Sequence, residues 1–403
     1  SSVHDVPCAL ITGTNGKTTT ARMIAAIADA AGRIPGVSST DRVRVGTEIL
    51  DRGDWSGPGG ARLVMRDSRT QVGILETARG GMLRRGLALE HADVSAVLNV
   101  GADHLGEWGV GTLDGLAEGK FTVTRVADLV VLNADDEVVA ARADEVQAPI
   151  VWFSLDSKNP RVLTHLERGG RAYVLDGNEL CMRNGAESVR IVRDSEIPTT
   201  LNGAARYNTA NALAAAAIAH GLGFDLNSIR QGLIQFDNSV ESNPGRLNMF
   251  DLGGVQAIVD FAHNPHGVKA VCDLMGLLPA KRRLIVLGQA GDRDEDSIRE
   301  MTRITWAARP DLIVIKELTG HLRGRELGET PALIEDELQQ AGAPSKHFVH
   351  QPSELAAVRF ALEWSEPGDV LMLFAHDKRD EILQMLAKLS NSGWSPGTPL
   401  PLS

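Results

Sequence analysis

The stretch VPCALITGTNGKTTTARMIAAIADAA, residues 6–31, reads as a buried strand, a glycine turn and a helix. Residues 6–12 are short and apolar, and residues 17–31 combine good helix formers with helical periodicity. Between them, the glycines of residues 13–16 let successive backbone N–H groups point toward one place, where the helix N-terminus adds favourable dipole charge. This pattern predicts a phosphate-binding loop, with a plain glycine turn before an ordinary helix as the alternative.

The residue types in this loop also indicate which ligand it binds. Lys17 can reach outer phosphates, and the Thr18 hydroxyl can bind Mg²⁺. The strict Walker pattern has a glycine five residues before Gly16, where this chain has Ile11, so the loop is a shortened variant. We expect the phosphates of a bound nucleotide to contact Gly13, Thr14, Asn15, Gly16, Lys17, Thr18 and Thr19.

The rest of the N-terminal half alternates apolar strands with helices. Further strands are predicted at residues 71–75, 94–98, 129–132 and 149–153, and helices at 112–126 and 136–144. Such an alternation indicates a parallel sheet with both faces covered. From 161 to 193 turn signals become frequent, which predicts antiparallel hairpins, and helices are predicted at 207–220 and 226–235.

A polar, turn-rich segment around residues 238–245 precedes a second α/β rhythm. Strands are predicted there at residues 257–259, 284–287, 312–315 and 370–374. The expected fold class is therefore α/β, with two domains. Residues 1–243 form a P-loop ATPase-type, mostly parallel sheet with appended hairpins, and residues 244–403 form a smaller Rossmann-like domain.

Composition excludes several classes of protein. The chain has 403 residues and a net charge of −11, so it has no global attraction to nucleic acid or anionic lipid, and neither partner is expected. No apolar stretch approaches the length of a membrane span. The three scattered cysteines match neither a disulfide framework nor a zinc site, so a reducing cytoplasm is expected.

Glu76 and His104 are candidate metal ligands. Each follows a predicted parallel strand, so both should lie near the carboxyl edge of the sheet, beside the phosphate loop. A carboxylate and an imidazole could complete a Mg²⁺ shell next to phosphate, although Mg²⁺ prefers oxygen. A solvated or capping carboxylate and a structural histidine are the alternatives.

Several motifs in order along the chain resemble one family. They are GTNGKTT at 13–19, LETARGG at 75–81, ADHLG at 102–106, NPGR at 243–246 and DFAHNP at 260–265. Together they are similar to the Mur ligase superfamily, which includes folylpolyglutamate synthetases, and most similar to the Mur-ligase-like half of the cyanophycin synthetases. The resemblance implies an ATP-dependent ligase that couples a carboxylate to an amino acid through an acyl phosphate.

The same resemblance implies roles for individual residues. Lys17, Glu76, His104 and Lys120 would be catalytic, and Mg²⁺ would be held by Thr18, Glu76, His104 and Lys120, the last of them carbamylated. Asn211 shares a helix face with Asn208 and would contact adenine, while Arg246 and Asp260 would contact phosphate and ribose. For Lys120, Asn211 and Arg246 the alternatives are a surface lysine, a surface amide and a salt-bridge arginine.

Substrate residues are expected in both domains. In the first, Thr40, Asp41 and Arg79 are candidates to recognise the acceptor; in the second, the resemblance adds His263. Arg323 and Arg325 could fork onto the carboxylate of an incoming amino acid, or could belong to a solvated basic turn.

Alternatives for the function stay open at this stage. The partners would be an amino acid, with arginine added to an aspartate side chain as one option, and a carboxylate-bearing peptide or small molecule. The chain has no room for the ATP-grasp half of cyanophycin synthetases, so it is either a fragment or a standalone ligase with another acceptor. A cell-wall or folylpolyglutamate-type ligase and a non-ligating ATP-binding switch or scaffold are the other readings, and an oligomer is compatible with all of them.

Overall fold

The computed structural model describes residues 6–103 and 109–401, so the predicted ligand His104 lies outside the described residues. The chain divides into two compact units, Ser1–Asp237 and Asn238–Ser403, called unit 1 and unit 2 below. In the described part of the chain, no helix has the length and apolar character needed to cross a membrane.

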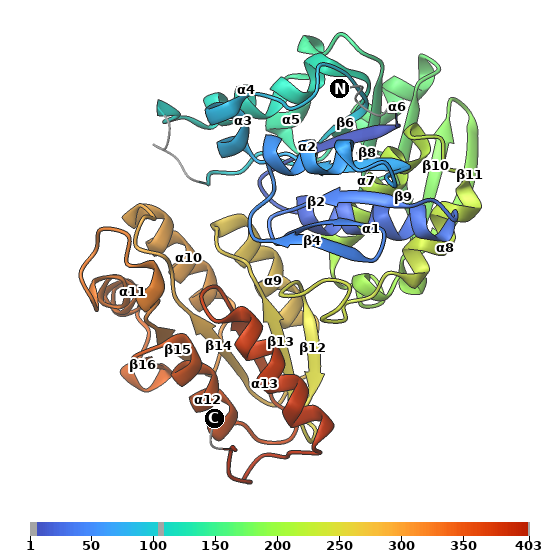
Figure 1. Cartoon of the computed structure of the whole chain (residues 1–403). Helices are drawn as coiled ribbons and strands as arrows, with labels where there is room; N and C mark the ends of the chain where they lie inside the picture. Colours follow the sequence, from blue (N-terminus) through green and yellow to red (C-terminus); the bar gives the residue numbers. More distant parts are fainter. Residues whose placement is uncertain (1–5, 104–108, 402–403) are drawn as a thin grey trace. The chain divides into compact units, whose positions relative to one another are not determined.

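Unit 1 is built on one large twisted sheet (Figure 1). Among the described residues it has eleven strands in the order β11-β10-β9-β8-β7-β6-β1-β5-β2-β3-β4. The strands from β9 to β2 run parallel, and antiparallel strands extend both edges. Their bounds are β1 Cys8–Thr12, β2 Pro35–Ser38, β3 Arg42–Val45, β4 Glu48–Arg52, β5 Val72–Glu76, β6 Ala92–Val97, β7 Ala127–Asn133, β8 Ile150–Ser154, β9 Arg171–Asp176, β10 Glu179–Asn184 and β11 Glu187–Arg193.

Helices cover both faces of this sheet because alternate residues of its central strand are apolar on both sides. In β1, Ala9 and Ile11 join a core with α1, α7 and α8, whereas Cys8 and Leu10 join a second core with α2 and α4. The helices are α1 Lys17–Ala30, α2 Pro58–Arg66, α3 Arg79–Arg85, α4 Leu113–Phe121, α5 Glu137–Ala140, α6 Pro160–Glu167, α7 Arg206–Gly221 and α8 Leu226–Gln235.

Unit 1 confirms the predicted sheet and corrects several local predictions. The hairpins occupy 171–193 only: residues 160–167 form helix α6, with Asn159 as N-cap and Pro160 in the first turn. The predicted helix 112–126 is α4 followed by a 3-10 segment, Thr122–Val126, where β-branched residues replace helix formers. The predicted helix 136–144 is likewise broken into α5 and a 3-10 turn, Ala143–Glu145.

Unit 2 has a smaller sheet of six strands in its described part, in the order β12-β13-β17-β14-β15-β16. Only β12 runs antiparallel to its neighbour. Helices α12 and α13 cover one face, and α9, α10 and α11 pack side by side (Figure 1). The bounds are β12 Asn248–Asp251, β13 Gln256–Asp260, α9 Pro265–Leu277, β14 Arg283–Leu287, α10 Glu295–Ala307, β15 Leu312–Lys316, α11 Glu329–Gln340, β16 Phe348–Gln351, α12 Glu354–Trp364, β17 Val370–Phe374 and α13 Arg379–Asn391.

The predicted fold class is confirmed: a large, mostly parallel α/β sheet with appended hairpins precedes a smaller α/β unit. In both units the parallel strands end on loops that carry the polar residues of interest. Ligands of such sheets bind beyond the carboxyl ends of the strands. In each unit, the candidate residues are therefore those that these loops carry.

Candidate active site

Three neighbouring strands bring the predicted residues of unit 1 to one sheet edge. β1 lies between β5 and β6, with Ile11 paired to Glu76 and Thr12 paired to Val97. The phosphate loop follows β1, Glu76 is the last residue of β5, and residues 98–103 follow β6. The register of the parallel sheet thus places Glu76 next to the start of the phosphate loop.

The phosphate loop has a fixed backbone. Gly16 is the N-cap of α1 with φ +86°, a left-handed conformation that favours glycine. The Thr14 N–H donates to the Asn99 carbonyl over 3.0 Å, and the Asn15 N–H donates to Asn99 Oδ1 over 2.8 Å. The Lys17 ammonium donates to the carbonyls of Gly13 and Thr14, both at 2.9 Å, so its charge lies over the loop. This arrangement suits a bound phosphate.

Asn211 lies against the same loop. A Cβ added at Gly16 would overlap with Asn211 Oδ1, and Asn211 Nδ2 donates to Asn208 Oδ1 over 3.2 Å. Both asparagines are buried on α7. The structure therefore gives Asn211 a contact with the loop, and its contact with adenine stays a prediction.

Glu76 is the centre of an oxygen cluster. Its side chain is 1% exposed; Oε2 accepts from the Thr18 hydroxyl at 2.9 Å, and Oε1 accepts from the Thr40 hydroxyl at 2.7 Å. The Thr40 N–H also donates to Oε2 over 3.2 Å. One carboxylate and two hydroxyls beside a phosphate loop fit Mg²⁺, which usually takes few protein ligands and completes its shell with phosphate and water.

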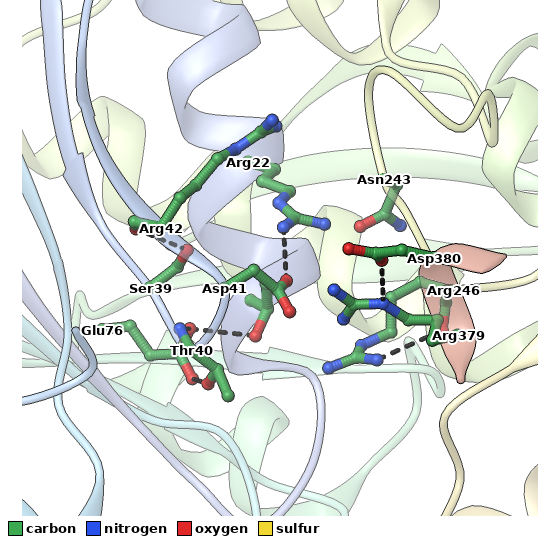
Figure 2. A network of polar contacts seen from close by, with 12 residues as sticks. Arg22, Ser39, Thr40, Asp41, Arg42, Glu76, Asn243, Arg246, Arg379 and Asp380 are labelled. Carbon is green, nitrogen blue, oxygen red and sulfur yellow. Dashed lines mark hydrogen bonds and ion pairs between the residues drawn. The ribbon is translucent and has the colours of Figure 1, made fainter. Parts of the chain in front are cut away.

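A buried ion pair fixes the turn that carries Thr40. Arg22 Nη2 lies 2.6 Å from Asp41 Oδ2, and the side chains are 4% and 9% exposed (Figure 2). Arg22 is on the buried face of α1, so the pair connects the phosphate-loop helix to the β2–β3 turn. Arg22 is not among the predicted site residues, although a single charged residue in the otherwise uncharged helix segment 18–28 was a usable signal. Asp41 is thus already paired within unit 1.

Lys120 lies in a positively charged part of the site. It lies on α4 and is 6% exposed. Burial and the positive charges of Lys17 and Arg79 lower its pKa to about 7, although the negative charge of Asp103 opposes this shift. Arg79, the first residue of α3, is 8% exposed, and its Cγ lies 3.8 Å from where a Cβ at Gly119 would be. The positive charges of Lys17 and Arg79 thus act on Lys120, which favours an anionic ligand beside it.

In unit 2, Asp260 and Arg246 are close in space. Asp260 is buried and accepts from the backbone N–H groups of Leu247 (2.9 Å) and Ala262 (2.8 Å); burial raises its pKa and Arg246 opposes that shift. The Arg246 guanidinium lies 4.7 Å from the centre of the Phe261 ring. His263 Nδ1 lies 3.0 Å from the Phe261 carbonyl. Asp260 therefore organises this loop, and the proposed nucleotide contacts remain predictions.

The two arginines expected to bind an amino acid carboxylate already have partners in unit 2. Arg325 donates to the carbonyls of Gly291 (3.0 Å) and Arg293 (3.2 Å) and to Glu329 (2.9 Å), and it is 14% exposed. Arg323 pairs with Asp292 at 2.6 Å but is 47% exposed. Arg325 thus holds two loops together, and Arg323 is the more accessible of the two.

Comparison with known proteins identifies the family. The Mur ligase middle domain matches residues 11–219, and the Mur ligase glutamate ligase domain matches residues 245–376. Cyanophycin synthetase of Synechocystis sp. is 39% identical over 372 residues, which is 92% of this chain and 42% of that protein. UDP-N-acetylmuramoyl-L-alanyl-D-glutamate–2,6-diaminopimelate ligase of Corynebacterium glutamicum is 27% identical, covering 94% of this chain and 72% of that one.

Solved structures show the same fold. E. coli FolC in complex with DHPP and ADP has a TM-score of 0.70 at 20% identity, covering 96% of this chain and 90% of that chain. A bifunctional folylpolyglutamate synthase/dihydrofolate synthase with Mn, AMPPNP and L-glutamate bound has a TM-score of 0.71 at 22% identity, with the same coverage. The chain spans less than half the length of the cyanophycin synthetases that it matches. The chain belongs to the Mur ligase family.

Proposed function

We propose that the protein is an ATP-dependent carboxylate–amine ligase. A substrate carboxylate oxygen attacks the γ-phosphorus of ATP, which forms an acyl phosphate and releases ADP. The amino group of an amino acid then attacks the acyl carbon, which forms the amide, loses a proton and releases phosphate. Residues 1–243 would bind ATP and residues 244–403 would bind the amino acid. The carrying observation is the meeting of the phosphate loop, Glu76 and the buried cations at one sheet edge.

The residues of unit 1 divide the work in this scheme. The loop from Gly13 to Thr19 and the Lys17 ammonium hold the phosphates, because phosphoryl transfer depends mainly on positioning and charge neutralisation. Thr18, Glu76, Lys120 and His104 would hold Mg²⁺, which supplies electrostatic stabilisation of the transferring phosphoryl group. Arg79 would bind the acceptor carboxylate beside them, with Thr40 and Asp41 shaping the acceptor side.

Lys120 is suited to the carbamate that the family resemblance implies. An amine with a pKa of about 7 is about half unprotonated at pH 7, and this neutral fraction can attack CO₂. The nitrogen then releases a proton to solvent, and the product carbamate is an anion. That anion would balance the charges of Lys17 and Arg79. The buried position of Lys120 would protect the carbamate from water.

The identity of the substrates is proposed from the relatives of the chain. Because the cyanophycin synthetases are 36–39% identical to the chain, we propose a carboxylate-bearing peptide as acceptor and arginine as the first amino acid to test. Arg323 and His263 would contact that amino acid, and Arg246, Asp260 and Asn211 the nucleotide. With three buried free cysteines, the protein would work in the reducing cytoplasm.

The test is substrate-dependent ADP release with identification of the product. The protein is incubated with ATP, Mg²⁺, each of the twenty amino acids and short aspartate-containing peptides, and the peptide mass is measured. A ligase releases ADP only when both substrates are present, and the peptide gains one amino acid residue. Release that is independent of the acceptor, or no release with any pair, would favour an ATP-binding switch instead.

A further inference from the structure

Unit 2 contains a buried charged cluster next to the loop that follows β13. Lys316 is the last residue of β15 and Glu354 the first of α12; both side chains are at most 1% exposed, and they form an ion pair. The Lys316 ammonium also donates to the carbonyl of Phe374, the last residue of β17, and lies 3.3 Å from His376 Nδ1. The cluster therefore joins the carboxyl ends of two parallel strands.

Glu354 fixes the turn after β17. Its Oε1 accepts from the His376 N–H at 2.8 Å, and its Oε2 accepts from the Lys378 N–H at 2.5 Å. Lys316 lowers the pKa of this carboxyl against the effect of burial, which alone would raise it, so Glu354 is ionised. A carboxylate with two backbone N–H donors and an ammonium has its hydrogen bonds satisfied.

His376 extends the connection to the loop after β13. Its Nε2 lies 3.0 Å from the Ala262 carbonyl, so Nε2 donates, and Nδ1 faces the Lys316 ammonium as an acceptor. Its ring packs edge-on against Phe261 with the centres 5.3 Å apart. Burial and the neighbouring Lys316 hold the pKa of His376 well below its usual value, so the ring is neutral. The turn 375–378 is thus tied to the loop 261–264.

We propose that Lys316, Glu354 and His376, called the strand-end triad below, are positioning residues that hold loop 261–264 and turn 375–378 in the arrangement that receives the amino acid. The catalytic part of this proposal rests on the proposed function. A buried Lys–Glu pair is often replaceable by apolar residues with no loss of stability. This pair, however, also binds three backbone groups, which would lose their partners in such a replacement, so the pair fixes the backbone of the turn after β17 as well as its own charges.

The main experiment uses the double variant Lys316→Met/Glu354→Leu, which removes both charges at similar volume. We expect it to fold, with amide hydrogen exchange at 261–264 and 375–378 accelerated about tenfold or more and exchange in β14 unchanged. The KM for the amino acid should rise about tenfold, while the KM for ATP changes little. A purely structural pair would change the melting temperature without this division between the two KM values.

A second set of variants tests the histidine alone. His376→Gln keeps an amide donor for the Ala262 carbonyl, whereas His376→Leu removes it. We expect faster exchange at 261–264 for the leucine variant, and partial recovery for the glutamine variant. The matched control is Lys269→Met/Asp273→Leu, which removes an exposed pair 2.7 Å apart on α9 of the same unit and should change neither exchange nor either KM.

The outcomes separate this proposal from the proposed function. Exchange is measured without substrates, so it tests the triad even if the native protein ligates nothing. Native exchange at both segments in a folded double variant would overturn the proposal, as would faster exchange with both KM values unchanged in an active ligase. If the double variant does not fold, the comparison of His376→Leu with His376→Gln decides in the same way.

Discussion

Each unit contains one buried lysine near the carboxyl edge of its sheet, and the two lysines have opposite surroundings. Lys316 is paired with the carboxylate of Glu354, whereas Lys120 experiences the positive charges of Lys17 and Arg79 and the opposing charge of Asp103. Burial lowers the pKa of both amines. Burial alone therefore does not identify a functional lysine. A buried lysine is a candidate when its charge is incompletely neutralised and it lies next to a ligand-binding loop.

The largest expected effect is on the stability of a variant at Lys316, the lysine whose charge is neutralised by Glu354. Lys316→Met leaves the Glu354 carboxylate buried without its counter-ion, which should cost about 3–5 kcal/mol in the free energy of unfolding. Urea unfolding of the native protein, the single variant and Lys316→Met/Glu354→Leu would measure this cost. The double variant should lose less stability than the single one, because it leaves no unpaired buried charge, although three backbone groups lose their partners. A single variant as stable as the double one would show that the two side chains are not coupled.

The next effect concerns the lysine of the phosphate loop. Lys17→Ala removes the ammonium that lies over Gly13 and Thr14, and ADP release should fall about a thousandfold, the upper range for one preorganised charge at a transition state. Lys158→Ala, an exposed lysine of the same unit, is the control and should be as active as the native protein. An unchanged rate for Lys17→Ala would refute the assignment of the phosphate loop.

Lys120 should contribute to activity through a negatively charged group whose effect small anions can partly restore. Lys120→Ala removes the group proposed to carry the carbamate, and the rate should fall about a hundredfold, as for loss of one electrostatic contact. Acetate or formate, which can occupy the space as anions, should restore part of the rate, and the same salts should not help Lys17→Ala. The absence of both loss and rescue would remove the carbamate from the mechanism.

Local sequence patterns predicted those features of the site that depend on residues close together in the chain. The phosphate loop and the strand end at Glu76 follow from a few adjacent positions and from sheet geometry. The strands β2, β3 and β4 were missed because they contain proline, glycine or charged residues and lack the continuous apolar run that identified β1 and β5.

The triad was missed for a different reason. Lys316 and Glu354 are 38 positions apart and Lys316 and His376 are 60 apart, so no local motif connects them. The arginines of unit 2 show the converse difficulty: Arg325 fits an anion-binding motif, yet backbone carbonyls and Glu329 use its donors. Only the tertiary structure shows which charges are already compensated.

The smallest effect is a pH dependence of stability that belongs to Lys120. With a folded pKa of about 7 and an ordinary value of 10.5, the lysine is protonated in both states below pH 7, and between these values mainly in the unfolded chain. The unfolded state therefore binds more protons in this window, and this term makes the native protein more stable as pH rises. Lys120→Met has no such amine, so we expect this variant to be more stable than the native protein at pH 7. The difference between their unfolding free energies should decrease by about 1.4 kcal/mol per pH unit above pH 7.

Urea unfolding of both proteins at pH 7, 8 and 9 in CO₂-free buffer measures this difference, in which other titrating groups cancel. Addition of bicarbonate should reduce the advantage of Lys120→Met further, because a carbamate formed only in the folded protein stabilises the native state as a bound ligand does. A difference that is constant with pH would mean that Lys120 keeps its proton in the fold. The comparison with Lys316 would then lose its electrostatic basis, since both lysines would be stably charged.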